Sequence, residues 1–321
     1  MNSEVWYRHA VANRLQSFLL LSVMAGFLAL LGWLVWGADG VMVLLITGAV
    51  LVMLNPLTTP YLIMRMYQAR PLHPAEAAGL YRLLQTLAQR AGMARVPELY
   101  YVPSSVLNAF AVGRKNHGAI AVTDGLLRSL GSRELTAVLA HEISHLRSND
   151  IWVMGLADMF SRMTGFLSLF GQILLLINLP LILLMDVSVN WIAILILILA
   201  PNLSALAQLG LSRTREYDAD LNAARITGDP DALASALVKI ERRQGGWLEQ
   251  IFMPGRGLPN PSLLRTHPPT EERVRRLMEL KHSPEVEQSA RQPLFQVLPN
   301  DLFGNPISGP PRRRFFSGLW Y

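Results

Sequence analysis

The sequence predicts a helical membrane protein with four transmembrane helices and a mainly helical polar domain that carries a small β-sheet. Charged residues make up 16 % of the chain, whereas an ordinary soluble domain has about 25 %. The apolar residues gather in four long runs that contain no charge. The polar stretches between these runs combine helical periodicity with short β-strand patterns.

Each uncharged run is long enough to cross a bilayer as a helix, which takes about 20 apolar residues. The runs lie between Arg14 and Asp39, Asp39 and Arg65, Arg162 and Asp186, and Asp186 and Arg213. Buried core helices are the alternative, but core helices seldom stay uncharged for so long. A cleaved signal peptide fits the first run poorly, because the run exceeds the usual apolar region of about 7–15 residues and lacks a small-residue cleavage site.

Positive charge at the ends of the runs predicts their orientation. Arg14 precedes the first run, and Arg162 and Arg213 flank the second hairpin, whereas the turns around Asp39 and Asp186 contain no lysine or arginine. Cytoplasmic loops carry the excess of Lys and Arg. We therefore expect a multi-pass protein of the cytoplasmic (inner) membrane, with both termini and the polar segments in the cytoplasm. The net charge of +6 agrees with this topology, and no basic stripe with aromatic platforms indicates a nucleic-acid partner.

The runs divide the chain into five segments. These are an N-terminal arm with the first transmembrane hairpin (1–66), a first polar part (67–162), the second hairpin (163–212), a second polar part (213–283) and a proline-rich, basic and aromatic tail (284–321).

Local patterns predict the elements of the polar parts. Helices are expected over 74–92, from Ser132 as N-cap, and over 213–226, 230–243 and 270–281; strands are expected over 98–102 and 119–123. From Pro284 onward an irregular tail is expected.

An H-E-x-x-H motif, His141-Glu142-Ile143-Ser144-His145, lies in the helix predicted from Ser132. Residues i and i+4 share one face of a helix, so both imidazoles reach one metal ion. Glu142 lies beside the ion, where its carboxylate can take a proton from a water and give it to a leaving amine. This chemistry is that of a zinc metallopeptidase. A helix with two surface histidines and a glutamate is the alternative.

A third ligand is expected on another element, because a catalytic zinc has three protein ligands and an open position. The chain has no cysteine, so this ligand is a histidine or a carboxylate. Glu216 and Asp220 follow the fourth run and lie one helical turn apart. One can bind the metal while the other orients a ligand imidazole; a solvated charged helix face is the alternative. The two motifs flank the second hydrophobic hairpin, which is expected to bring them together.

These motifs together resemble the HtpX branch of membrane zinc peptidases, which is related to the CAAX prenyl protease. Besides the two hydrophobic hairpins, the matching segments are Asn108-Ala109-Phe110-Ala111, His141-Glu142-Ile143-Ser144-His145 with Asn149-Asp150, Glu216-Tyr217-Asp218-Ala219-Asp220, and Thr266-His267-Pro268-Pro269-Thr270-Glu271-Glu272-Arg273. They follow the order of the family and extend over residues 10–280.

The resemblance implies a zincin-type peptidase domain with one Zn²⁺ per chain. Glu216 would be the third zinc ligand, and Asp220 would support a ligand histidine. Asn108, Ala109, Phe110 and Ala111 would belong to an edge strand that pairs with the substrate backbone, and His267 would stabilise the oxyanion. The substrates would be membrane or misfolded proteins, cleaved in protein quality control and the stress response.

Two other functions stay open at this point. One is a catalytically silent membrane scaffold with a structural zinc site, although a structural site usually fills all four positions with protein ligands. The other is a CAAX-type processing protease, which is expected to have more spans. The tail carries Arg312-Arg313-Arg314 beside aromatic residues, and we expect it either to dock on the cytoplasmic face of the membrane or to be a disordered segment.

Overall fold

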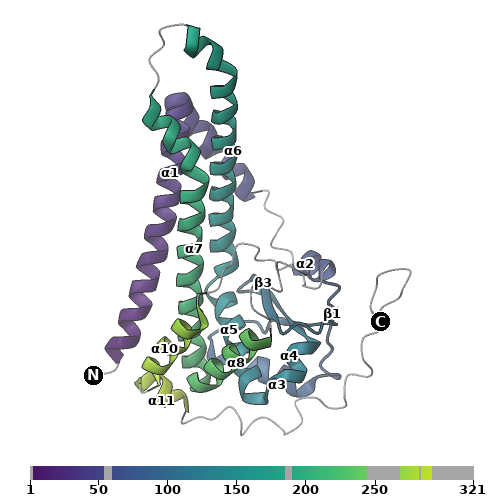
Figure 1. The fold of residues 1–321 in the computed structure, drawn as a ribbon. Coiled ribbons are helices and arrows are strands. Elements are labelled where there is room, and N and C mark those ends of the chain that lie inside the picture. Colours follow the sequence, from purple (N-terminus) through teal and green to yellow (C-terminus); the bar gives the residue numbers. More distant parts are fainter. Residues whose placement is uncertain (1–2, 54–59, 185–189, 244–267, 282, 291–321) are drawn as a thin grey trace. The chain divides into compact units, whose positions relative to one another are not determined.

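The computed structural model describes residues 3–53, 60–184, 190–243, 268–281 and 283–290 (Figure 1). The chain divides into two compact units. The sheet unit comprises Met1–Asn13, Leu57–Ile151 and Arg215–Tyr321, and the helix unit comprises Arg14–Pro56 and Trp152–Thr214. His267 and residues 291–321, with Arg312–Arg314, lie outside the described residues.

Among the described residues, three helices are long and apolar enough to cross a membrane. They are α1 (Ser3–Met53), through its stretch Ala10–Leu51, α6 (Asp150–Leu184) and α7 (Trp191–Thr227). Only 17–22 % of the most apolar window of each helix is buried, and large apolar side chains such as Leu45, Phe166 and Leu206 are exposed. Such surfaces suit lipid and do not fit the alternative of buried core helices.

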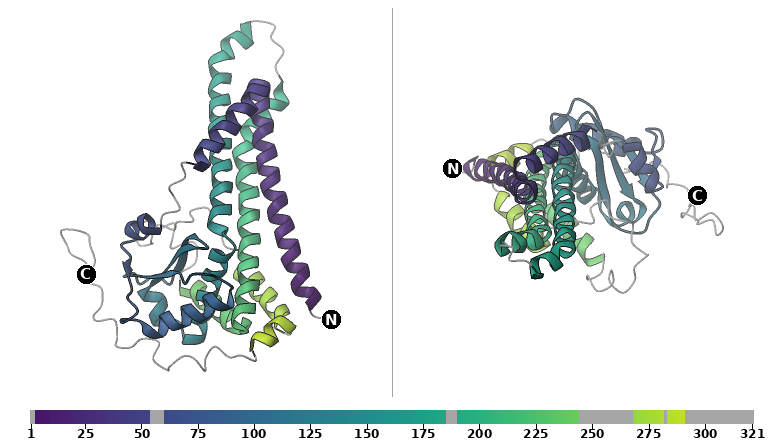
Figure 2. Two further views of the ribbon diagram at one scale, coloured as in Figure 1. Left: turned by 180° about the vertical axis from the view of Figure 1, so that it is seen from behind. Right: turned by 90° about the horizontal axis from the view of Figure 1, so that it is seen from above.

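The helix α1 bends back on itself at Gly37, which has φ 63° and ψ −143° (Figures 1 and 2). On the far side of the bend, a Cβ on Gly40 would lie 2.1 Å from the carbonyl oxygen of Gly32. From the same side, Leu44 packs against a cluster that includes Leu28 and Leu31 from before the bend. The structure thus shows three membrane-length helices, one of them bent into two arms, and four separate spans remain a prediction.

Close packing and neutral polar contacts join α6 to α7 in the helix unit. A Cβ on Gly171 would lie 2.1 Å from Leu197 Cδ2. The hydroxyls of Ser161 and Ser204 are 3.0 Å apart, and Ser168 Oγ donates to Leu197 O at 2.6 Å. Small residues and hydroxyls at such interfaces are typical of membrane helices.

A mixed four-stranded sheet forms the centre of the sheet unit (Figure 1). Its strands are β1 (Arg70–Pro71), β2 (Glu98–Val102), β3 (Ala109–Arg114) and β4 (His117–Thr123), in the spatial order β1-β2-β4-β3. The central strands β2 and β4 are parallel, and β3 is antiparallel to β4. The predicted strand 98–102 is confirmed, 119–123 begins two residues earlier, and β3 lies at a sheet edge as expected for the segment that begins at Asn108.

Seven further helices belong to the described part of the sheet unit. They are α2 (Pro60–Met66), α3 (Ala78–Arg90), α4 (Asp124–Ser129), α5 (Ser132–Arg147), α8 (Pro230–Arg243), α10 (Thr270–Leu280) and α11 (Pro284–Ala290). The leucines of α3 and nearly all of α5 are buried in one apolar core. The motif-bearing helix therefore lies inside the unit.

Several predicted boundaries were wrong. The helix expected over 74–92 begins at Ala78 and ends before Gly92, which takes a positive φ of 68°. Ser132 is the first helical residue and Gly131 is the N-cap, whose amide donates to Glu134 Oε2 at 2.9 Å. Residues 213–226 continue α7 without a break. Residues 284–290 form the helix α11, where an irregular tail was expected.

Candidate metal centre

The two histidines of the motif lie one turn apart on the same face of α5 and are both buried. Their Nε2 atoms are 3.1 Å apart, and their rings meet edge to face. Burial of α5 among apolar side chains fixes both rings in one geometry, which a surface helix would not do. The alternative of two surface histidines is therefore wrong.

Glu216 of α7 completes the group. Its Oε2 lies 3.6 Å from His141 Nε2 and its Oε1 lies 3.7 Å from His145 Nε2, and the three ligand atoms all lie within 4.8 Å of one another. Ligand atoms at about 2.1 Å around a tetrahedral zinc are about 3.4 Å apart. The observed spacings fit one ion shared by three protein ligands.

The outer nitrogens of both imidazoles lie against carboxylates. Asp220 Oδ1 is 3.0 Å from His141 Nδ1, and Asp150 Oδ2 is 2.7 Å from His145 Nδ1. Such carboxylates fix the ring tautomer, direct Nε2 toward the metal and increase its basicity. Of the two carboxylates at this motif, Glu216 lies next to both Nε2 atoms and Asp220 lies next to the outer nitrogen of His141.

Two buried arginines hold these carboxylates in turn. Arg273 of α10 donates from Nε to Asp220 Oδ2 at 2.7 Å and from Nη2 to Asp220 Oδ1 at 2.6 Å, and its Nη1 is 3.4 Å from Glu216 Oε2. Arg215 donates from Nε to Asp150 Oδ1 at 2.7 Å and from Nη2 to the same oxygen. Each arginine thus holds a support carboxylate, and Arg273 also contacts the third ligand.

Negative charge exceeds positive charge in this cluster. Its buried acids are Glu142, Asp150, Glu216, Asp218 and Asp220, against Arg215 and Arg273. With neutral histidines, the form that binds a metal, these described residues carry a formal net charge of −3. Uncompensated buried charge is strongly unfavourable, so the cluster fits a divalent cation.

The pKa of His141 reflects the same excess of negative charge. Burial is the largest influence and lowers this pKa, but the carboxylates of Asp220 and Glu216 outweigh it and raise the pKa to about 10. Burial likewise lowers the pKa of Arg273, and Asp220 more than reverses the effect. Both shifts show that the centre favours positive charge.

Three residues of this network had no role assigned from the sequence: Asp150, Arg215 and Arg273. Asp150 and Arg273 lay inside the family-like segments, which was the available signal. Glu142 follows His141 and is buried. Ala109, Phe110 and Ala111 lie on the edge strand β3, and Asn108 directly precedes it.

The sequence of this chain is similar to those of known peptidases. Residues 74–281 match the peptidase family M48. Curated relatives described as "Protease HtpX homolog" include one from Desulforapulum autotrophicum, 33 % identical over 83 % of this chain and 90 % of the relative. Another from Acaryochloris marina is 37 % identical (84 % and 95 %), and one from Pyrococcus furiosus is 36 % identical (82 % and 94 %). Among solved structures, the crystal structure of S. mikatae Ste24p is 21 % identical with a TM-score of 0.46, over 84 % of this chain and 66 % of that chain.

Proposed function

The chain belongs to peptidase family M48, and on this premise we propose that it is a membrane-anchored zinc metalloendopeptidase. The observation that carries the proposal is the buried set of His141, His145 and Glu216 around one point, with a carboxylate behind each histidine. Two histidines and a glutamate leave the fourth tetrahedral position open, as in other catalytic zinc sites.

Zinc at this set would supply Lewis-acid activation of a water and of the scissile carbonyl. Glu142 is the general base, which takes the proton of the attacking water and returns it to the leaving amine. Asp220 and Asp150 hold the histidines in the orientation that this arrangement needs. We assign His267 to oxyanion stabilisation on the family resemblance alone.

The edge strand β3 supports a mode of substrate binding. Of the strands described, β3 pairs only with β4, so its other edge offers backbone groups to a further strand. An extended substrate that begins opposite Asn108 and Ala109 and continues past Phe110 and Ala111 would bind by β-augmentation. Backbone pairing of this kind depends little on the substrate's side chains and suits misfolded proteins as a substrate class.

We further propose that the membrane is crossed four times: by the two arms of α1, by α6 and by α7. The positive flanks place both termini and the metal centre in the cytoplasm. Residues 67–162 and 213–283 then form one peptidase domain on that side, and membrane or misfolded proteins reach it from the bilayer surface.

The decisive experiment uses the full-length protein purified in detergent, with casein as substrate and zinc content measured by mass spectrometry. We expect about one zinc per chain, loss of casein cleavage with a chelator, and recovery on adding zinc back. Glu216→Ala should lose zinc and activity together. Stoichiometric zinc without cleavage would favour the silent scaffold, and cleavage confined to prenylated C-terminal peptides would favour the CAAX-type protease.

A further inference from the structure

The short helix α2 exposes large apolar side chains although it belongs to a well-packed unit. Tyr61, Leu62 and Met66 are 65 %, 49 % and 73 % exposed. On the opposite side, Met64 packs with Tyr67 against the sheet. The sheet thus holds α2 by one face, while the other face presents apolar surface that an aqueous environment does not favour.

Basic side chains surround this exposed face. A pocket of about 390 Å³ is lined by Pro60 and Tyr61 of α2 together with Arg95, Lys115 and His117, and Arg65 belongs to α2 itself. Among the described residues, Arg65, Arg95 and Lys115 have no ion-pair partner. Glu98 is the acidic residue of the lining, and it accepts a hydrogen bond from Tyr100.

The short connection between α1 and α2 keeps α2 near the bilayer surface. The apolar stretch of α1 continues to Leu51, and α1 ends at Met53. Seven residue steps then separate Met53 from Pro60, which span at most about 25 Å when fully extended. A helix tethered so closely to a membrane segment stays within reach of the headgroups.

We propose that α2 and its basic neighbours dock on anionic phospholipid headgroups. The leaflet is the one at which the two ends of the first hydrophobic hairpin lie. We name this surface the α2 surface: Tyr61, Leu62, Arg65 and Met66 of α2, with Arg95 and Lys115. The aromatic and apolar side chains enter the interface. The arginines and the lysine attract the anionic headgroups.

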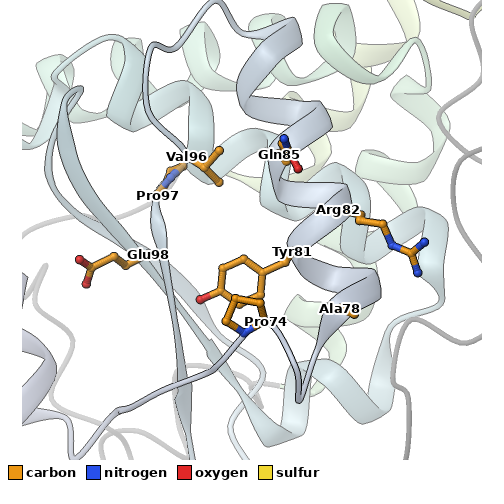
Figure 3. Close-up of a pocket in the computed structure, with 8 residues that line it drawn as sticks. All are labelled: Pro74, Ala78, Tyr81, Arg82, Gln85, Val96, Pro97 and Glu98. Carbon is orange, nitrogen blue, oxygen red and sulfur yellow. The ribbon is translucent and has the colours of Figure 1, made fainter.

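A neighbouring pocket of about 530 Å³ lacks the excess of basic side chains found near α2 (Figure 3). It shares Glu98 with the first pocket, and Arg82 lies at its opposite end. This opposite pair gives no net attraction for an anion. The pocket therefore serves as a matched control surface for the α2 surface.

Docking of α2 would also place the edge strand. A Cβ on Gly113 would lie 2.9 Å from Pro60 Cγ and 2.2 Å from His117 O, and Gly113 has a φ of +96°. Pro60 thus packs tightly on the turn between β3 and β4. A lipid-bound α2 would therefore hold β3 close to the membrane surface, which bears on the substrate binding proposed above.

The test uses the absence of cysteine from the chain. A single cysteine at Leu62, with a second variant at the exposed Glu241 of α8 as reference, is labelled with an environment-sensitive fluorophore in the full-length protein. The protein is placed in nanodiscs whose lipids carry a quencher, with either anionic or zwitterionic headgroups. We expect strong quenching at position 62 in anionic nanodiscs, less in zwitterionic ones, and little at position 241.

Charge variants in the labelled background make the test specific. Replacing Arg65, Arg95 and Lys115 by Gln together should lower the quenching at position 62 toward that in zwitterionic lipid, whereas Arg82→Gln should leave it unchanged. Quenching at position 62 as low as at 241 would overturn the proposal. Equal quenching in both lipids, or shielding of the label only when a peptide substrate is added, would also overturn it.

Discussion

The metal centre of the sheet unit and the α6–α7 interface of the helix unit both bury polar groups, but they satisfy them differently. Around His141 and His145, charged carboxylates pair with charged arginines. Between α6 and α7, the described contacts join hydroxyl and carbonyl groups, such as Ser168 Oγ and Leu197 O. Charge is thus buried where a cation can compensate it, and neutral groups serve where the surroundings are lipid.

This contrast predicts very different costs for losing one partner. Removing one member of a buried ion pair leaves the other as an uncompensated charge. Removing one hydroxyl from a membrane-helix interface costs much less, because its partner finds another group. The following variants test the comparison from the largest expected effect to the smallest.

Glu142→Gln should reduce casein cleavage by about 10²–10⁴-fold or more, because an amide cannot act as general base. Zinc content should remain that of the wild type, since the side chain is not a proposed ligand. Glu241→Gln, at an exposed position of α8, is the control. Activity within a few fold of the wild type would remove Glu142 from the mechanism.

Arg273→Gln should lower the free energy of unfolding by about 3–5 kcal/mol, because Asp220 and Glu216 lose their buried cation. The matched control is Arg275→Gln on the same helix, whose exposed ion pairs with Glu272 and Glu279 are worth about 0–1 kcal/mol. Thermal unfolding in detergent with a chelator present measures both. Equal unfolding midpoints for the two variants would show that the buried ion pairs of Arg273 stabilise the protein no more than the exposed ones of Arg275.

Asp220→Ala should weaken zinc affinity about 10–100-fold, because His141 loses the carboxylate that orients it. Competition with a metal indicator measures the affinity, and Asp231→Ala on α8 is a control for general effects of losing an acid. Complete loss of zinc in Asp220→Ala, with retention in Glu216→Ala, would exchange the two roles.

Ser161→Ala should destabilise the α6–α7 interface by only about 0.6 kcal/mol, the usual scale for hydrogen bonds between membrane helices. Thermal unfolding in the same detergent should therefore place this variant close to the wild type. A loss as large as that of Arg273→Gln would contradict the difference drawn between the two regions.

Periodicity and spacing predicted much of this molecule. The strand over 98–102 is rich in tyrosine and valine, as strands are, and the i, i+4 spacing placed His141 and His145 on one face. The helical repeat also placed Asp220 one turn from Glu216 within one segment. Each of these features depends on residues close together in the chain.

Long-range contacts and local caps were harder to predict. Arg273 meets Asp220 across 53 residues. Helical spacing places Arg273 on the face of the buried Leu277 and Leu280, but it does not show which acid an inward-facing arginine contacts. Gly131 rather than Ser132 caps α5, because Glu134 serves the glycine amide. The two spans expected on either side of Asp39 meet at Gly37, whose backbone dihedrals are not helical, and the sequence does not show how tightly the chain turns there.

The position of Arg273 has a consequence for biosynthesis. Translation proceeds from the N-terminus, so the growing chain contains His141, His145, Asp150, Glu216 and Asp220 before it contains α10. Until α10 is made, the acidic cluster has Arg215 but lacks Arg273, the second of its two buried arginines. A nascent chain therefore completes its centre only after α10 has been synthesised, more than 50 residues after Asp220.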